Sequence, residues 1–239
     1  MIELIGVTKS YAKGSVKAVA DVTLTVKPGE IFGFLGPNGA GKTTTIKMIV
    51  GLLQPDSGSV KVANIDVLRD PLTAKRQIGF VPDQPQVYDR LTGAEYLNFL
   101  ADVYQVPERR RGKRIEHLLE LFGIKEAIGD LVQSYSHGMK QKLVLTGALL
   151  HNPPVWIMDE PMVGLDPRSS FLLKDLMGEH CCHGNTVFFS THILEVAERL
   201  CDRVAIINKG KIIACGTLDE INKHHEKETL EKIFLELTQ

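Results

Sequence analysis

A glycine-rich loop that ends in lysine and threonine constrains this chain more strongly than any other part of its sequence. Residues 36–43 read Gly-Pro-Asn-Gly-Ala-Gly-Lys-Thr, which fits the pattern of a glycine, four residues, and then Gly-Lys-Thr. The loop follows a short apolar run at 31–35, and a helical segment from about 42 to 52 comes after it. Strand, loop and helix in this order predict a loop that binds phosphate groups.

The residue types in this loop each have a physical reason to be there. Glycines let backbone N–H groups curl around phosphate oxygens, and the N-terminus of the following helix adds positive potential. We expect Lys42 to reach the β- and γ-phosphates of a nucleotide, and the Thr43 hydroxyl to bind Mg²⁺. A purely structural turn needs neither side chain. The predicted phosphate cradle comprises Gly36, Pro37, Asn38, Gly39, Ala40, Gly41, Lys42, Thr43 and Thr44.

Two adjacent acids supply the expected second half of a nucleotide site. Asp159 and Glu160 follow the apolar run at 155–158. At the end of a buried strand, Asp159 is placed to hold the Mg²⁺ shell, whereas Glu160 is the better candidate to polarise an attacking water. Two solvated carboxylates after a core strand are the simpler alternative, but that alternative does not explain the phosphate-binding loop upstream.

Composition indicates an ordinary globular protein. Of its 239 residues, 44% are hydrophobic and 24% are charged, and a formal net charge of -1 gives no sign of a polyanion partner. The basic run at 109–114 is expected to be a solvated helix start, so no nucleic-acid binding is predicted. The longest apolar stretches are far shorter than the roughly 20 residues that a membrane-crossing helix needs. Residues 1–5 lack the features of a secretory signal, which favours the cytosol.

The cysteines are expected to be reduced thiols. None of the four forms a CxxC pair, and a cytosolic location disfavours disulfides. The cluster His180-Cys181-Cys182-His183 offers soft metal ligands, but adjacent side chains point in divergent directions, whereas zinc sites usually join two separated ligand pairs. We therefore predict no metal ion at this cluster.

The spacing of apolar residues predicts an α/β fold. Residues 2–7 and 19–26 are β-rich and separated by a turn, which indicates an N-terminal antiparallel β subdomain. From 91 to 151, apolar residues recur every three or four positions, as they do in amphipathic helices. Later apolar runs alternate with helix-like segments, which predicts a mostly parallel sheet with crossover helices. These runs lie at 155–158, 186–190 and 204–207.

We expect a single domain over 1–239 with an inserted helical subdomain at 91–151. The core and the β subdomain are predicted at 1–90 and 152–225, and a C-terminal helix at 226–239. The apolar face of that helix is expected to dock on the body of the protein rather than on a membrane. Acidic residues beside the face further disfavour anionic lipid. The face comprises Leu230, Ile233, Phe234 and Leu237, and the acids are Glu226, Glu228, Glu231 and Glu236.

The segment between the two nucleotide motifs resembles the signature of a known family. Residues 135–141 read Tyr-Ser-His-Gly-Met-Lys-Gln. This is similar to the signature of ABC (ATP-binding cassette) proteins, which usually reads Leu-Ser-Gly-Gly followed by a polar, glutamine-containing helix. Further matches follow in family order and cover essentially the whole chain. Tyr11 stands at the place of an adenine-stacking aromatic residue, Gly164-Leu165-Asp166 resembles the D-loop, and Ser190-Thr191-His192 resembles the segment of the switch histidine.

This resemblance implies a phosphate-loop ABC ATPase core that needs two subunits for activity. Two copies, or one copy and a paralogous cassette, would sandwich two ATP molecules head to tail. Ser136 and the backbone of Gly138 would donate to the γ-phosphate bound by the other subunit. His192 would steady the transferring phosphate, and Asp166 would link the two sites. The resemblance also implies Mg²⁺-dependent ATP hydrolysis coupled to a separate membrane permease, with the chain held at the cytoplasmic face of the cell membrane.

Two positions depart from the family pattern. His137 stands where the family has the first glycine of the signature pair, which adds a side chain near the expected γ-phosphate. The family normally has glutamine directly after a proline in the segment where this chain reads Pro82-Asp83-Gln84. Asp83 can approach Mg²⁺ as an oxygen ligand. The sequence leaves open whether Asp83 or Gln84 takes the usual part of this loop, which is to sense the metal site and touch the membrane partner.

Three segments, at 33–44, 88–93 and 230–238, look like the subgroup that partners exporter permeases. The main alternative is a soluble ABC ATPase acting on ribosomes or DNA, but such proteins usually carry two cassettes or a long coiled-coil insertion. A phosphate-loop kinase leaves the signature segment unexplained, and a non-hydrolysing regulatory subunit does not fit the intact set of candidate catalytic residues. The chain does not specify the cargo, because that specificity would lie in the permease.

Overall fold

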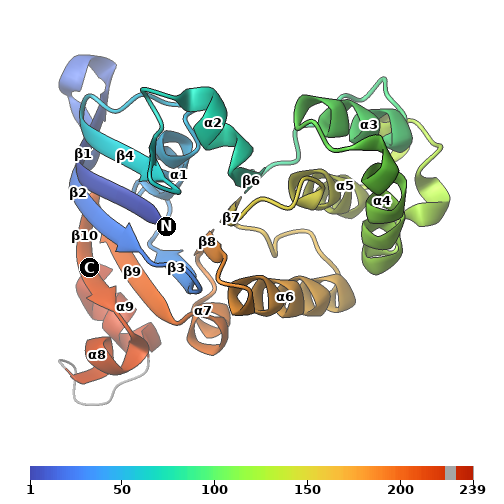
Figure 1. Ribbon diagram of the computed structural model, residues 1–239. Coiled ribbons are helices and arrows are strands. Elements are labelled where there is room, and N and C mark those ends of the chain that lie inside the picture. The colour runs from blue at the N-terminus through green and yellow to red at the C-terminus, as the bar shows by residue number, and fades with distance from the viewer. Residues whose placement is uncertain (224–229, 239) are drawn as a thin grey trace.

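The computed structural model describes residues 1–223 and 230–238, whose strands form two sheets (Figure 1). The smaller sheet has four strands in the order β2-β1-β4-β5, and all neighbours are antiparallel. A short 3₁₀ turn at Ala12–Gly14 joins the first two strands along the chain. The strands are β1 (Ile2–Tyr11), β2 (Val16–Val26), β4 (Ser57–Val62) and β5 (Ile65–Asp66).

The larger sheet has six strands in the order β10-β9-β3-β8-β7-β6. All neighbours are parallel except β10, which pairs with β9 in the antiparallel direction. The strands are β3 (Ile31–Leu35), β6 (Ile78–Val81), β7 (Val155–Asp159), β8 (Thr186–Thr191), β9 (Arg203–Asn208) and β10 (Lys211–Gly216). A mostly parallel sheet beside an N-terminal antiparallel sheet confirms the predicted fold class.

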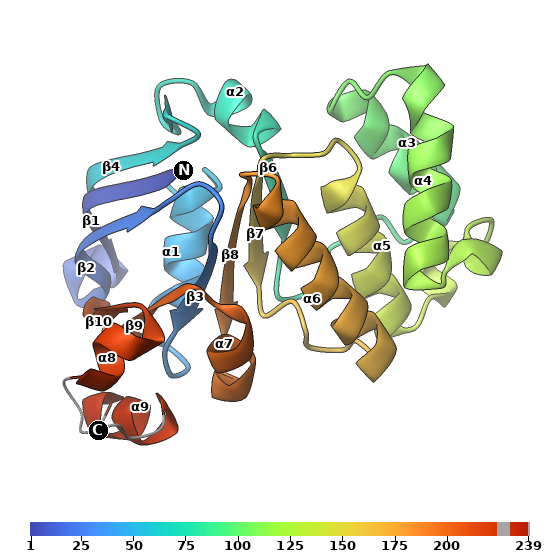
Figure 2. The same ribbon diagram turned by 60° about the horizontal axis from the view of Figure 1, so that its bottom comes forward.

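Helix α1 (Lys42–Ile49) lies between the two sheets and carries the phosphate loop at its N-terminus (Figure 2). The central strands β3, β7 and β8 of the larger sheet are buried at every position, so their side chains alternate between two apolar cores. Phe32 and Phe34 of β3 pack in the core with α1, whereas Ile31 belongs to the core on the opposite face. Phe188 of β8 stacks on Phe32 with ring centroids 5.8 Å apart and also contacts Phe34.

Three helices form a separate lobe beside the larger sheet, drawn in green to yellow in Figure 1. Thr92 and Glu95 form a capping box at the start of α3, and Gly123 in the left-handed conformation caps the C-terminus of α4. The helices pack through the fully buried side chains of Leu97 and Leu143, among others. They are α3 (Gly93–Val103), α4 (Glu108–Phe122) and α5 (His137–Leu149).

The basic run at 109–114 is not simply a solvated helix start. Arg111 pairs with Asp102 at 2.6 Å, which ties α4 to α3. Arg114 donates to the carbonyl oxygen of Leu149 at 2.7 Å and to Asn152 at 3.0 Å, which ties α4 to the end of α5. Both arginines join α4 to a neighbouring element through hydrogen bonds, so they have a structural role.

The remaining helices complete the cover of the core. Leu230 and Ile233 of α9 are buried with Ala197 of α7, as expected for a docked C-terminal helix. The predicted helix start at 226, the acids Glu226 and Glu228, and the side chain of Leu237 lie outside the described residues. The helices are α2 (Pro71–Arg76), α6 (Pro167–Cys182), α7 (Leu194–Leu200), α8 (Leu218–Lys223) and α9 (Leu230–Thr238).

Several predicted boundaries were too short or too long. Strand β1 continues to Tyr11 and β2 begins at Val16, because the polar ends of both strands pair through their backbones. Helix α1 ends at Ile49 rather than at about 52, and Gly51 follows with a φ of +68°. Within residues 1–223 and 230–238, no helix has the length and apolar character needed to cross a membrane.

We predict that Phe188→Ala destabilises the fold by about 3–5 kcal/mol, because it removes a buried ring that contacts both Phe32 and Phe34. Urea unfolding followed by fluorescence or circular dichroism measures the change. Phe171→Ala is the matched control: this phenylalanine on α6 is 63% exposed, so its loss should change the free energy of unfolding by no more than about 0.5 kcal/mol. Equal losses in the two variants would contradict the assignment of the core.

Candidate active site

The phosphate loop joins β3 to α1 and is held by close backbone contacts. A Cβ on Gly36 would collide with the carbonyl oxygen of Ile207, and a Cβ on Gly41 would collide with that of Ala18. Gly41 also has a φ of +111°, which disfavours any other residue. The fold therefore requires glycine at both ends of the loop.

Lys42 is almost fully buried and points back into the loop. Its ammonium group donates to the carbonyl oxygen of Gly36 at 2.6 Å and to that of Pro37 at 3.3 Å. Burial lowers the pKa of Lys42, while the charges of Glu160 and Asp159 oppose that shift. The positive charge is thus placed inside the cradle where the sequence predicts phosphate oxygens.

A cavity of about 240 Å³ lies over this loop. It brings together most of the predicted cradle and the three candidate acids from β7 and the loop after β6. Gly36 and Ala40 are part of the loop but do not line the cavity, and Ala18 of β2 is a lining residue that sequence reasoning missed. The lining residues are Ala18, Pro37, Asn38, Gly39, Gly41, Lys42, Thr43, Thr44, Asp83, Asp159 and Glu160.

Asp159 is buried and accepts hydrogen bonds on both carboxylate oxygens. The Thr43 hydroxyl donates to Oδ2 at 2.7 Å, and the Ser190 hydroxyl donates to Oδ1. Burial raises the pKa of Asp159; these two hydrogen bonds lower it, and the nearby carboxylates of Asp83 and Glu160 raise it further. Ser190 lay in the predicted switch segment, yet its contact with Asp159 was not foreseen.

Glu160 has an unusual backbone and a polar partner on each side. Its φ of +50° is rarely adopted by residues other than glycine, and such strain is often found at functional positions. The Glu160 N–H donates to the Ser190 hydroxyl at 3.0 Å, and the His192 Nδ1 lies 3.0 Å from the Glu160 Oε1. The predicted base and the predicted switch histidine are therefore in direct contact.

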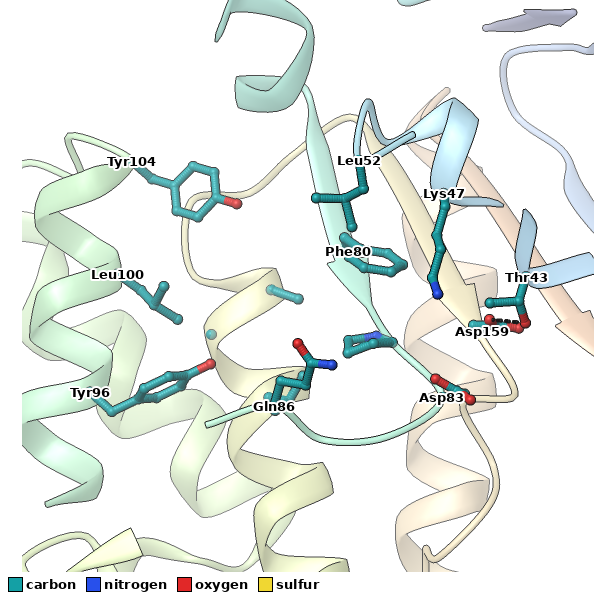
Figure 3. Close-up of a pocket in the computed structure, with 14 residues that line it drawn as sticks. Thr43, Lys47, Leu52, Phe80, Asp83, Gln86, Tyr96, Leu100, Tyr104 and Asp159 are labelled. Carbon is teal, nitrogen blue, oxygen red and sulfur yellow. Dashed lines mark hydrogen bonds between the residues drawn. The ribbon is translucent and has the colours of Figure 1, made fainter. Parts of the chain in front are cut away.

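The loop after β6 places Asp83, and not Gln84, beside the metal-binding candidates. Asp83 lines the cavity over the phosphate loop and also a second cavity of about 310 Å³ toward the helical lobe (Figure 3). The Gln84 backbone N–H donates to the Asp83 carboxylate at 2.9 Å, but the Gln84 side chain lines neither cavity. Gln86 and Lys47, which sequence reasoning missed, both line the second cavity.

The signature segment and the D-loop form a second group of candidates. Ser136 caps α5 and accepts from the Met139 N–H at 3.3 Å. Asp166 caps α6 and pairs with Lys142 of α5 at 2.7 Å. The hydrogen bond from Lys142 is the main reason that the pKa of Asp166 is lowered. Lys142 was missed because it lies 24 positions from its partner.

Tyr11 stands apart from both groups. It lies at the end of β1, is 44% exposed, and does not line the cavity over the phosphate loop. It pairs with Val16, two residues before the lining residue Ala18. Stacking of Tyr11 on adenine stays a prediction.

The donor set beside the phosphate loop suits Mg²⁺. The Thr43 hydroxyl and the carboxylates of Asp159 and Asp83 are hard oxygen donors on one cavity, and Mg²⁺ usually completes its shell with water and phosphate oxygens.

Among the described residues, no group of three His, Cys, Asp or Glu side chains is close enough to hold an ion. In the 180–183 cluster, His180 stacks on Trp156 while Cys182 is exposed.

A comparison with protein-family models matches residues 19–163 to the ABC transporter family. This range includes the phosphate loop, the signature segment, and Asp159 and Glu160 at the end of β7. Among curated relatives, the ABC transporter ATP-binding protein NatA of Bacillus subtilis is 37% identical over 224 residues, which are 93% of this chain and 91% of that protein. The linearmycin resistance ATP-binding protein LnrL of Bacillus subtilis is 38% identical over 221 residues, which are 92% of this chain and 70% of that protein.

Solved structures agree with this match. The ATP-binding subunit of an ABC transporter superposes with a TM-score of 0.95 at 35% identity, and each chain is covered completely. A dimeric ATP-binding cassette in a post-hydrolysis state, bound to ADP and Pi, gives a TM-score of 0.83 at 29% identity over 91% of this chain and 99% of that chain.

We predict that Asp83→Asn raises the Mg²⁺ concentration needed for half-maximal ATP hydrolysis by roughly tenfold, because a charged oxygen facing the metal-binding candidates is lost. A titration of ATPase rate with Mg²⁺ at fixed ATP measures the change. Gln84→Ala is the control and should leave the titration unchanged, since its side chain lines neither cavity. Equal Mg²⁺ requirements in the two variants would show that Asp83 does not face the metal.

Proposed function

Because this chain belongs to the ABC transporter family as an ATP-binding protein that hydrolyses ATP, we propose that it is the motor of an exporter. In this proposal it powers a separate membrane permease through ATP-dependent dimerisation. The permease holds the chain at the cytoplasmic face of the cell membrane. The partner cassette is a second copy or a paralogue.

The phosphate loop and the two acids at the end of β7, Asp159 and Glu160, have separate roles in ATP hydrolysis. Lys42 and the backbone of the loop hold the phosphates, and Glu160 accepts a proton from the attacking water. The water oxygen bonds to the γ-phosphorus as the bond to the ADP oxygen breaks, which yields ADP and inorganic phosphate. His192 holds the Glu160 carboxylate in place, as their 3.0 Å contact allows. When bound, Mg²⁺ would neutralise phosphate charge, with Thr43, Asp159 and Asp83 as its protein ligands.

The observation that carries the dimer proposal is the separation of the two residue groups. Ser136 and Gly138 lie at the start of α5 in the helical lobe, and among the described residues none of α5 lines the cavity over the phosphate loop. The signature of one subunit is therefore available to the nucleotide of another, as in the sandwich that the family resemblance implies. The dimeric neighbour with bound ADP and Pi supports this arrangement.

The position of the loop after β6 favours contact with the permease at the second cavity. Asp83 lines both cavities, whereas Gln86 lines only the one toward the helical lobe (Figure 3). A permease segment at the second cavity would thus be one short loop away from the metal-binding candidates.

We assign export because a resistance protein is among the relatives, and because the sequence resembles the exporter subgroup.

We predict that Glu160→Gln lowers ATP turnover by about 10²–10⁴-fold while ATP binding persists, because the proton acceptor is lost and the cradle remains. Phosphate release measures turnover, and size-exclusion chromatography with ATP detects the trapped dimer. Normal turnover would remove Glu160 from the role of base. Lys42→Ala is the contrasting variant: it should weaken ATP affinity itself, because the buried ammonium group is lost from the cradle.

The membrane partner is tested by tagging the Glu160→Gln variant in its native cell and solubilising membranes gently with ATP present. Mass spectrometry then identifies the proteins that co-purify. Stoichiometric recovery of a multi-span membrane protein is the expected result. Recovery with ribosomes or DNA-binding proteins, and without a membrane protein, would keep the ATPase and refute the transport function.

A further inference from the structure

His137 lies against the backbone of Gly164 within the same subunit. A Cβ on Gly164 would lie 2.6 Å from the imidazole Cδ2 of His137 and 2.9 Å from its Nε2, so the ring occupies the space beside this glycine. Gly164 has a φ of +81°, which glycine adopts without strain. The side chain that departs from the family signature is therefore directed onto the D-loop.

Two neighbouring contacts join the same elements. A Cβ on Gly138 would lie 2.9 Å from the carbonyl oxygen of Gly164, so the helix backbone approaches the D-loop closely at that point. One turn further along α5, Lys142 pairs with Asp166 at 2.7 Å. Residues four apart share a helix face, so Gly138 and Lys142 present one side of α5 to the D-loop.

The turn at 160–166 runs from the candidate base to this contact. The Val163 N–H donates to the carbonyl oxygen of Glu160 at 3.1 Å, and the Leu165 N–H donates to that of Met162 at 3.3 Å. The turn ends at Asp166, which caps α6 through hydrogen bonds from Ser169. A side chain that packs on the middle of this turn therefore contacts the chain between Glu160 and Asp166.

We propose that His137 is a positioning residue that clamps the 160–166 turn onto the N-terminus of α5. The signature and the D-loop of one subunit then meet the partner's nucleotide as one unit. This role in catalysis rests on the proposed ATP-sandwich dimer, whereas the clamp itself is a property of the single subunit. The ring acts by packing on Gly164, and it does not need to touch phosphate.

The clamp is tested in the nucleotide-free full chain by hydrogen–deuterium exchange of peptides that contain Val163 and Leu165. We expect His137→Gly to speed exchange there by about three- to tenfold, as loss of one packing contact predicts. His137→Phe keeps a flat ring and should preserve wild-type exchange. Unchanged exchange in the glycine variant would overturn the proposal. A matching thermal unfolding temperature for both variants would show that the fold is intact.

The catalytic consequence is tested in the Glu160→Gln background by measuring the ATP-dependent dimer dissociation constant. The added His137→Gly should raise that constant by about three- to tenfold, while the added His137→Phe should leave it within about twofold. Equal loss in both variants would mean that an imidazole nitrogen contacts the nucleotide, and would overturn the packing role. If Glu160→Gln alone does not dimerise with ATP, the proposed function fails, and the exchange result still decides the clamp.

Discussion

Most of the site depends on the hydrogen bonds that the buried carboxylate of Asp159 accepts. Burying a charge is costly unless hydrogen bonds offset the loss of water, and here Thr43 and Ser190 supply them. Thr43 lies in the first turn of α1 and Ser190 lies in β8, so the carboxylate at the end of β7 joins that helix to the neighbouring strand. Ser190 also accepts from the Glu160 N–H, which sets the direction in which the chain leaves the strand. The positions of the phosphate cradle and the water-facing acid are thus coupled through a single group.

Helix α5 connects the two parts of the molecule that the nucleotide site needs. Its first turn carries the signature and faces the D-loop, whereas its end packs directly on the larger sheet. A Cβ on Gly79 of β6 would lie only 2.6 Å from the carbonyl oxygen of Ala148, so helix and strand touch through their backbones. Strand β6 leads into the loop of Asp83. The first turn of α5 thus contacts the D-loop and its last turn contacts the strand that precedes Asp83, although the signature and Asp83 lie more than 50 positions apart in the sequence.

The sequence predicted best those features that depend on local pattern. Strand β3 has the predicted bounds because a fully buried run is apolar at every position and ends at turn residues. The ends of β1 and β2 were missed, since polar residues there pair through backbone groups that no side-chain pattern reveals. Ser190 and Lys142 were missed for a different reason: each has a distant partner that only folding brings near. The choice between Asp83 and Gln84 depended on side-chain direction within a turn. The catalytic roles of the site residues stay predictions that experiments must test.

Steric contacts, as well as phosphate binding, require glycine at the two ends of the phosphate loop. The carbonyl oxygens of Ile207 and Ala18 leave no room for a methyl group at Gly36 or Gly41, and neither contact involves a nucleotide. A descendant of this chain that had lost catalysis would therefore have to keep both glycines to fold in the same way, while Lys42 and Glu160 would be free to drift. In a set of diverging copies, the glycines would report inheritance of the fold, and only the lysine and the glutamate would report that selection still acts on the reaction.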